Sequence, residues 1–337
     1  MDERYDVVVI GGGAAGLSGA VAAARSRRSV LVVDAGAPRN APAGHIHNYL
    51  GREGCPPGEL LAAGRAELDG YGGTVVDGSV TAAEPVEGGF RVRLAGGETV
   101  HARRLLLTTG LVDELPEVDG LAGRWGRDVL HCPYCHGYEV RDRAIGVLAT
   151  GPAAMHHVQL FRQLSSDVTL FLHTGPEPTD EQWEQLAARG IAVVDGEVAG
   201  VEVTDGRLCG VRLRSGEVVA REALVVAPRF TARTPAVAGL SVTEVRMGEY
   251  VVGSQVDTDP TGATSVPGVW AAGNVADVMA QVGAAAAAGV RAGAAINADL
   301  VAEDVRAAVA ARRVGPFAAE QELCERVLGE RRHGMAV

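Results

Sequence analysis

A glycine-rich loop near the start of the chain constrains the fold more than any other feature. Residues 5–10 (YDVVVI) form a continuous apolar run, which is typical of a strand buried on both faces of a parallel sheet. The glycine-rich residues 11–16 follow, then a helical pattern over 17–27 and a second apolar strand at 30–33, which ends at Asp34. This order of strand, loop, helix and strand predicts one parallel βαβ unit.

Each glycine of this loop has a mechanical interpretation. Gly11 permits the tight turn, Gly13 lets the backbone approach a pyrophosphate, and Gly16 lets the helix pack closely on the strand. The N-terminus of the helix would supply N–H groups to the phosphates, and Asp34 is placed for ribose hydroxyls. The pattern predicts a dinucleotide site, and the alternative is an ordinary glycine-rich turn. The loop alone does not separate FAD from NAD.

A second strand–turn–helix unit begins at residues 144–149 (AIGVLA). The segment 223–227 closes this unit, and a strand at 269–272 with a helix from about 278 to 299 returns to the first one. We therefore expect two α/β units, with the second inserted into the first. Further strands are expected at residues 73–80, 90–94, 99–107, 168–172, 191–194 and 208–213, and a helical pattern in the tail after Val301.

Composition narrows the classes of partner. The net charge of −11 repels phosphate backbones, so we expect no nucleic-acid binding. No run of about 18 apolar residues predicts a membrane span, and the charged N-terminus does not resemble a signal peptide. Five scattered cysteines do not form a secreted disulfide framework, so we expect a cytoplasmic protein. Cys55, Cys209 and Cys324 are interpreted as inert thiols.

Cys132 and Cys135 form a Cys-x-x-Cys pair, which in a reducing compartment is either a redox couple or half of a metal site. Pro133 suits the first turn of a helix, and a helix start lowers the pKa of a thiol. A structural zinc site needs four converging ligands, whereas the chain has no second such pair and offers only nearby histidines. We predict a redox pair and no metal site.

Four motifs occur in a fixed order: the glycine loop, the tripeptide 108–110 (TTG), the cysteine pair, and residues 268–277 (GVWAAGNVAD). In this order they resemble the thioredoxin-reductase-like flavoprotein family across essentially the whole chain. The resemblance implies two Rossmann-like, three-layer ββα dinucleotide-binding domains, a homodimer, and FAD in the outer domain. It implies an FAD domain of residues 1–115 and 240–337, and an NAD(P)-binding-like domain of residues 116–239 that carries the cysteine pair.

The resemblance also implies a set of cofactor-binding residues. His47 and Asn48 would lie near the isoalloxazine ring, and Gln281 would cap it. Asn274 stands where the family usually has Asp, and an amide can still bind a ribityl hydroxyl. The full set is Gly11, Gly13, Ala15, Gly16, Asp34, Ala35, Arg39, His47, Asn48, Thr109, Gly110, Gly273, Asn274, Gln281 and Val282.

By the same resemblance, Cys135 faces the flavin and Cys132 exchanges with a substrate sulfur. The run 132–139 (CPYCHGYE) resembles the branch typified by gliotoxin and holomycin dithiol oxidases. His136 stands where reductases of the family usually have Asp. It can accept a thiol proton near neutral pH, and the alternative is that it only packs. The predicted catalytic residues are therefore Cys132, Cys135 and His136.

The second unit departs from an NADPH-binding reductase. Residues 149–154 (ATGPAA) retain only Gly151 of the first two glycines, and no arginine follows the next strand at 172–175 (LHTG). This weighs against NADP(H), although a poorer loop can still present N–H groups. We therefore expect oxidation of a small-molecule dithiol, with O2 as acceptor and H2O2 as product. An NADPH-dependent reductase of a thioredoxin-like protein is the alternative. A non-enzymatic flavin sensor is a further one, but no output domain is visible.

Overall fold

The computed structural model describes residues 3–234 and 237–314, together with residues 323, 326–327, 331–332 and 335–336. Cys324 lies outside this part of the chain, as does most of the predicted helical tail. Within the described residues, no helix combines the length and the apolar character needed to cross a membrane.

A parallel sheet forms the centre of the first domain. Its strands follow the order β3-β2-β1-β6, and β19 pairs with the end of β6 while β5 and β4 extend the sheet antiparallel from the start of β6. The apolar run of β1 is buried on both faces because layers cover it on each side. The strands are β1 (Glu3–Ile10), β2 (Val30–Asp34), β3 (Thr74–Asp77), β4 (Val80–Val86), β5 (Gly89–Leu94), β6 (Thr99–Leu107) and β19 (Val269–Ala271).

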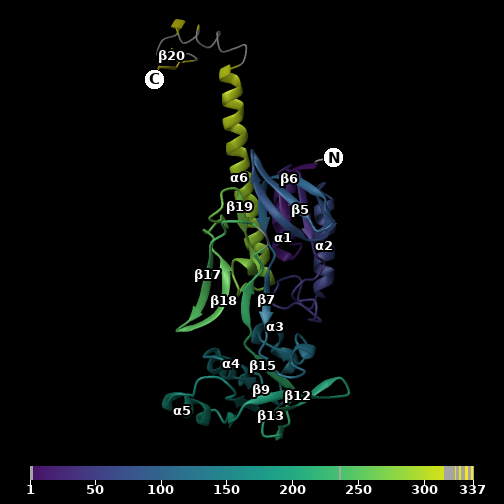
Figure 1. Ribbon diagram of the computed structural model, residues 1–337, viewed down its shortest axis with the longest axis vertical. Helices are drawn as coiled ribbons and strands as arrows, with labels where there is room; N and C mark the ends of the chain where they lie inside the picture. Colours follow the sequence, from purple (N-terminus) through teal and green to yellow (C-terminus); the bar gives the residue numbers. More distant parts are fainter. Residues whose placement is uncertain are drawn as a thin grey trace.

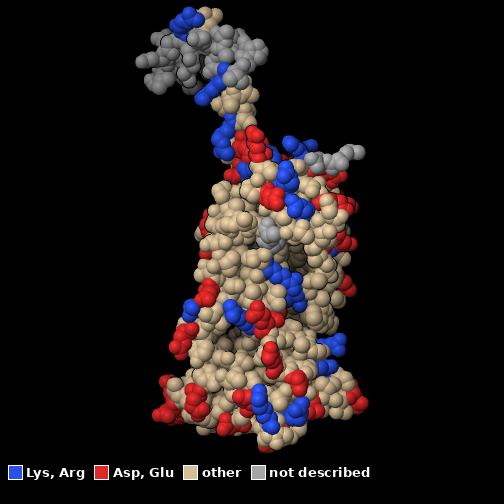
Figure 2. Space-filling model, in the orientation of Figure 1, with Lys and Arg blue, Asp and Glu red and all other residues tan. Residues whose placement is uncertain are grey.

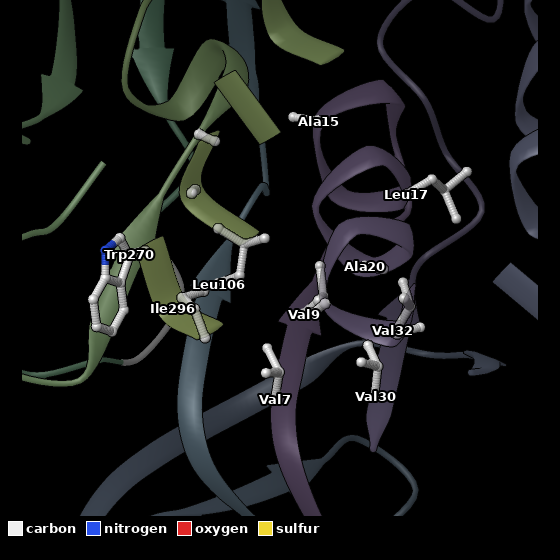
Figure 3. Packing of buried hydrophobic residues seen from close by; sticks show 14 of the residues in the cluster. Val7, Val9, Ala15, Leu17, Ala20, Val30, Val32, Leu106, Trp270 and Ile296 are labelled. Atoms are coloured by element: carbon white, nitrogen blue, oxygen red, sulfur yellow. The ribbon is translucent and has the colours of Figure 1, made fainter. Parts of the chain in front are cut away.

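Helices α1 (Ala14–Arg25), α2 (Pro57–Asp69) and α6 (Val282–Val314) contribute to the helical layer on one face of this sheet. Figure 3 shows Ile296 and Trp270 packed toward Leu106, beside the valines of the neighbouring strands. The long helix α6 crosses α1 and continues beyond the body of the protein, as Figure 1 shows in yellow.

Glycines make the α1–α6 crossing close. A Cβ atom added at Gly289 would lie 2.0 Å from the carbonyl oxygen of Ala15, and one added at Gly293 would lie 2.5 Å from that of Gly19. These distances leave no room for a methyl group, so the two helix backbones touch directly.

A small sheet forms the third layer of the domain. Its order is β17 (Val242–Met247), β18 (Tyr250–Val256), β16 (Arg229–Ala232) and β7 (Leu111–Glu114). Ala232 and Val256 pack on the face of the parallel sheet opposite the helices. The predicted three-layer ββα, α/β architecture is therefore confirmed.

The second domain lies at the lower end of Figure 1. Its five parallel strands have the order β11-β10-β9-β15-β8, and a three-stranded antiparallel sheet lies beside them. The elements are β8 (Val129–Leu130), β9 (Ile145–Leu148), α4 (Ala153–Phe161), β10 (Val168–Phe171), α5 (Asp180–Ala188), β11 (Ala192–Val194), β12 (Val198–Thr204), β13 (Arg207–Leu213), β14 (Val218–Val219) and β15 (Ala223–Val226). β16 comes before the predicted domain boundary at residue 240, yet it pairs with β7 and β18. The predicted boundaries stay a prediction.

Two helices differ from what the sequence predicted. The last helix was expected over residues 278–299, but α6 begins at Val282 and continues to Val314. The amide of Asn274 donates to the carbonyls of Asp277 and Ala280, which holds the preceding turn out of helical conformation. The sequence also did not predict α2, because its apolar positions are few and only Pro57 and Leu68 are buried.

Charged side chains on the face drawn in Figure 2 gather over the second domain and around the point where α6 leaves the body. Acidic and basic residues alternate there, and several form ion pairs. Arg103 and Arg104, for example, contact Glu303 of α6. The net negative charge therefore does not produce uniform repulsion at this end of the molecule.

We predict that Gly289→Ala destabilises the protein by at least about 2 kcal/mol, because the new methyl group overlaps the α1 backbone. Gly283→Ala is the matched control in the same helix, since its Cβ would meet only Tyr49 Cδ2 at 3.7 Å. Urea unfolding measures both. Equal stability of the two variants would contradict the close crossing.

Candidate active site

A cavity of about 860 Å³ runs from the glycine loop to the cysteine pair. Every predicted site residue except Gly16 and Asn48 lines it. The elements that meet there come from both ends of the sequence: the loop before α1, the segment before α6, and the start of the second domain. Figure 1 shows α3 (Pro133–His136) at the junction of the two domains.

The glycine loop has the geometry that its sequence predicts. Gly11 has a φ of +109°, and a Cβ at Gly16 would lie 1.9 Å from the carbonyl oxygen of Gly11. Gly16 therefore serves the packing of the helix and does not face the cavity. A Cβ at Gly13 would meet nothing within 4 Å, so the backbone here is open to the cavity. The buried Thr108 supports the loop by donating to the carbonyl of Gly11 at 2.7 Å.

Asp34 lies at the end of β2, and its carboxylate holds the neighbouring structure. Its Oδ1 accepts from the Gly12 N–H at 3.1 Å, and its Oδ2 lies 2.5 Å from Nη2 of Arg65. Arg65 comes from α2, the helix that the sequence did not predict. Asp34 still lines the cavity, with 15% of its side chain exposed.

The segment before α6 brings Gly273, Asn274 and Gln281 into the same cavity. Asn274 donates through Nδ2 to the carbonyl of Ala280 at 2.9 Å, and its Oδ1 lies 3.5 Å from Nη1 of Arg39. A carboxylate could not donate to a carbonyl. The asparagine that departs from the usual Asp is therefore suited to this turn.

The cysteine pair forms a disulfide at the start of α3. Cys132 is the N-cap residue, and its Sγ accepts from the N–H of Cys135 at 3.2 Å. Pro133 occupies the first helical position, as predicted, where its missing N–H costs nothing. A redox couple is consistent with this geometry. Among the described residues, no group of three or more His, Cys, Asp or Glu side chains has a geometry that could hold a metal ion.

His136 follows Cys135 and lines the cavity in a half-buried position. Burial lowers the pKa of His136, because the charged imidazolium loses water. Glu139 opposes this effect, and the nearby His47 and His45 reinforce it. His136 is consequently neutral at neutral pH, which is the state that can accept a proton.

His131 and His157 form a second pair of imidazoles beside Cys132. Their rings meet edge to face at 4.8 Å, and the ring of His131 also packs against Phe230 at 5.1 Å. Burial, together with the neighbouring His131 and His156, lowers the pKa of His157 to about 3. The sequence offered these histidines only as weak zinc ligands, because nothing in their spacing predicts the contact between the two rings.

The family model for pyridine nucleotide-disulphide oxidoreductases matches residues 5–289. Thioredoxin reductase sirT of Leptosphaeria maculans is 30% identical over 320 residues, which cover 90% of this chain and 96% of that protein. The chain belongs to the pyridine nucleotide-disulphide oxidoreductase family. The family predicted from the sequence is thus confirmed.

Other proteins that are similar to this chain match it over different lengths. Thioredoxin reductase tcpT of Claviceps purpurea (strain 20.1) is 37% identical over 175 residues, 49% of this chain, and the chain spans about half of that relative's length (54%). The crystal structure of HlmI shares 47% identity with a TM-score of 0.83, covering 91% of this chain and 96% of that one. An oxidoreductase from Agrobacterium tumefaciens shares 37% identity with a TM-score of 0.82, covering 88% and 99%.

Membership of this oxidoreductase family supports a bound FAD, and the residues present fit it. The open backbone at Gly13 and the start of α1 can receive a pyrophosphate, and Asp34 lies beyond them at the end of β2. The cavity then continues past Gly273 to the disulfide. A long dinucleotide can therefore extend from Asp34 toward Cys135.

The corresponding loop of the second domain is built differently from the first. Ala149 occupies the position of the first glycine, and its methyl group is buried against Gly175. His173, which follows β10, does not point to a free ligand position. Its Nδ1 accepts from the backbone N–H of Val198 at 3.0 Å. His173, which stands where arginines were expected after the strand, thus holds the start of β12.

We predict that His157 makes the protein less stable in acid. Because its folded pKa of about 3 is below the unfolded value of 6.5, only the unfolded state gains a proton as the pH falls between these values. His157→Phe should remove about 2 kcal/mol of the stability loss between pH 7 and pH 5. Urea unfolding at both pH values measures this, with His156→Phe at the exposed neighbouring position as control. The same pH dependence in all three proteins would contradict the prediction.

Proposed function

We propose that the protein is an FAD-dependent dithiol oxidase. It would convert a small-molecule dithiol to an intramolecular disulfide, pass the electrons to O2, and form H2O2. Two observations together carry this proposal. The cysteine pair at the cavity forms a disulfide, and the loop of the second domain has neither the first glycine nor a free basic side chain. We place it in the cytoplasm, because the other thiols of the described residues, Cys55 and Cys209, are free.

The chemistry of the chain's own residues starts at Cys132. A substrate thiolate attacks the Cys132 sulfur, which breaks the bond to Cys135 and releases the Cys135 thiolate. The second substrate thiol, deprotonated by His136, then attacks the substrate sulfur bound to Cys132, so that the cyclic disulfide leaves and Cys132 is released as a thiolate. The substrate has lost two electrons and two protons, and the cysteine pair has gained the two electrons. FAD, when bound, would supply the two-electron acceptor for the reduced cysteine pair, and O2 would be the final acceptor.

The side chains that line the cavity near Cys132 favour a small, uncharged substrate rather than the acidic surface of a protein substrate. His131, His157, Phe230 and Leu160 are neutral or apolar there. The guanidinium of Arg39 lies 5.4 Å from the centroid of the Phe230 ring, and it is already paired with Asp113 through two contacts of 2.6 and 2.8 Å. A flat dithiol could stack on the rings without displacing an ion pair.

We predict that anaerobic NADPH leaves the flavin of the purified protein oxidised, whereas a small dithiol bleaches it and consumes O2 in air. Cys132→Ser and Cys135→Ser should each lower the rate of O2 uptake at least about a thousandfold, since neither can form the mixed disulfide. Cys55→Ser is the control and should retain the rate. Rapid bleaching by NADPH would favour the alternative, a thioredoxin-reductase-like activity.

We further propose a homodimer, which the family resemblance implies. α6 supports it with exposed valines at Val290, Val301, Val305 and Val309, which follow helical spacing along one face. A second copy offers the same stripe, as a two-fold interface requires.

Sedimentation velocity of the full chain should give twice the mass of one chain. The double variant Val301→Glu with Val305→Glu should shift this to the monomer, because four carboxylates would meet at the two-fold contact. Arg306→Glu lies on another face of the same turn and should keep the dimer. A monomeric wild type would exclude the proposal.

A further inference from the structure

A loop of the first domain reaches across to the segment that carries the disulfide. Asn48 donates through Nδ2 to the carbonyl of Tyr134 at 2.6 Å, and Tyr134 lies between the two cysteines. His47 places its Nε2 3.3 Å from Oε1 of Glu139, three residues after His136. Both contacts therefore join the first domain to the short segment around α3.

The loop that makes these contacts is itself well supported. Ile46 donates its N–H to the carbonyl of Cys55 at 2.9 Å and accepts from Gly54 at 3.0 Å, which closes the loop at its base. Glu53 accepts from the backbone N–H of Asn48 at 3.0 Å and lies 2.5 Å from Nδ1 of His47. His47 is thus held between two carboxylates, one from each domain.

The relative position of the two domains needs a restraint of this kind, because within the described residues the chain crosses between them only twice, after β7 and before β16. Domains joined in this way move relative to each other unless their interface is large and apolar. Dithiol exchange requires the disulfide to face the bound substrate within a narrow range of positions. The contacts at Tyr134 and Glu139 hold the segment that carries Cys132, Cys135 and His136.

We propose that the pairs Asn48–Tyr134 and His47–Glu139 form an interdomain latch, which holds the disulfide against the cavity. Asn48 and Glu139 are then positioning residues for dithiol exchange, and in this respect the inference rests on the proposed function. Glu139 also raises the pKa of His136 while His47 lowers it, so the latch sets the charges around the proton acceptor. The resemblance placed His47 and Asn48 near the flavin ring; the latch gives Asn48 a different role.

Other contacts between the domains do not depend on these two pairs. Pro42 packs on Gly126, where an added Cβ would lie 2.7 Å from Cβ of Pro42, and His131 packs on Phe230. Variants of the latch should therefore fold and keep both domains intact. Asn48 has a φ of +59°, so glycine is the substitution that removes its amide without straining the backbone.

The test uses the FAD-loaded full chain with Asn48→Gly and Glu139→Gln, singly and together. The proteins are reduced with dithiothreitol under anaerobic conditions, freed of it by desalting, and treated with a maleimide that carries a polyethylene glycol chain. Mass mapping of peptides follows alkylation of Cys132 and Cys135, and the exposed Cys209 gives the internal reference rate. We expect the cysteine pair of the double variant to react about tenfold faster relative to Cys209, and the pair of each single variant to react at an intermediate rate. Each lost contact would let the second domain move away from the cavity and expose the pair.

Small-angle scattering of the same samples should show a larger radius of gyration for the double variant. Glu177→Gln, which removes an exposed carboxylate elsewhere in the second domain, should match the wild type in both measurements. If the double variant does not fold, the alkylation rate and the scattering of the Asn48→Gly single variant test the proposal. If the folded variants show the same alkylation rates and the same scattering as the wild type, the latch proposal is wrong. Failure of the proposed oxidase would show instead as a wild-type flavin that no small dithiol bleaches, which leaves the alkylation result unaffected.

Discussion

The close crossing of α1 and α6 is the contact on which the rest of the structure depends. Gly289 and Gly293 allow the two backbones to touch, and this brings the segment before α6 beside the glycine loop before α1. The cavity exists because these two segments, from opposite ends of the sequence, meet there. A methyl group at Gly289 would overlap the backbone of Ala15, which lines the cavity, and would push the two segments apart.

The second requirement is the orientation of the inserted domain. The disulfide belongs to that domain, while the residues that fit a dinucleotide belong to the first. The chemistry we propose therefore depends on an interface, and the loop around Asn48 is its polar part. In the second-domain loop, the methyl group of Ala149 lies against Gly175, and the ring of His173 is bound to the backbone N–H of Val198.

Local patterns predicted most of the first domain. β6 has the same bounds as the predicted strand at 99–107, and the predicted strand at 5–10 lies within β1, because continuous apolar runs bury on both faces wherever the sheet is formed. The helix α2 and the true start of α6 could not be predicted. The first has a weak apolar face, and the second is decided by the amide of Asn274, which binds carbonyls several residues ahead. Pairings such as Arg65 with Asp34 join residues from separate elements and leave no periodic signal.

By itself, the sequence determined the α/β class, the family, and the residue types gathered at the cavity, because glycine spacing, apolar runs and the Cys-x-x-Cys pair express short-range backbone constraints. Only the tertiary structure decided what each side chain contacts. It made Asn48 a contact between the domains, and it brought the rings of His131 and His157 into edge-to-face contact beside Cys132. These roles depend on distances between segments far apart in the chain, which no local pattern encodes.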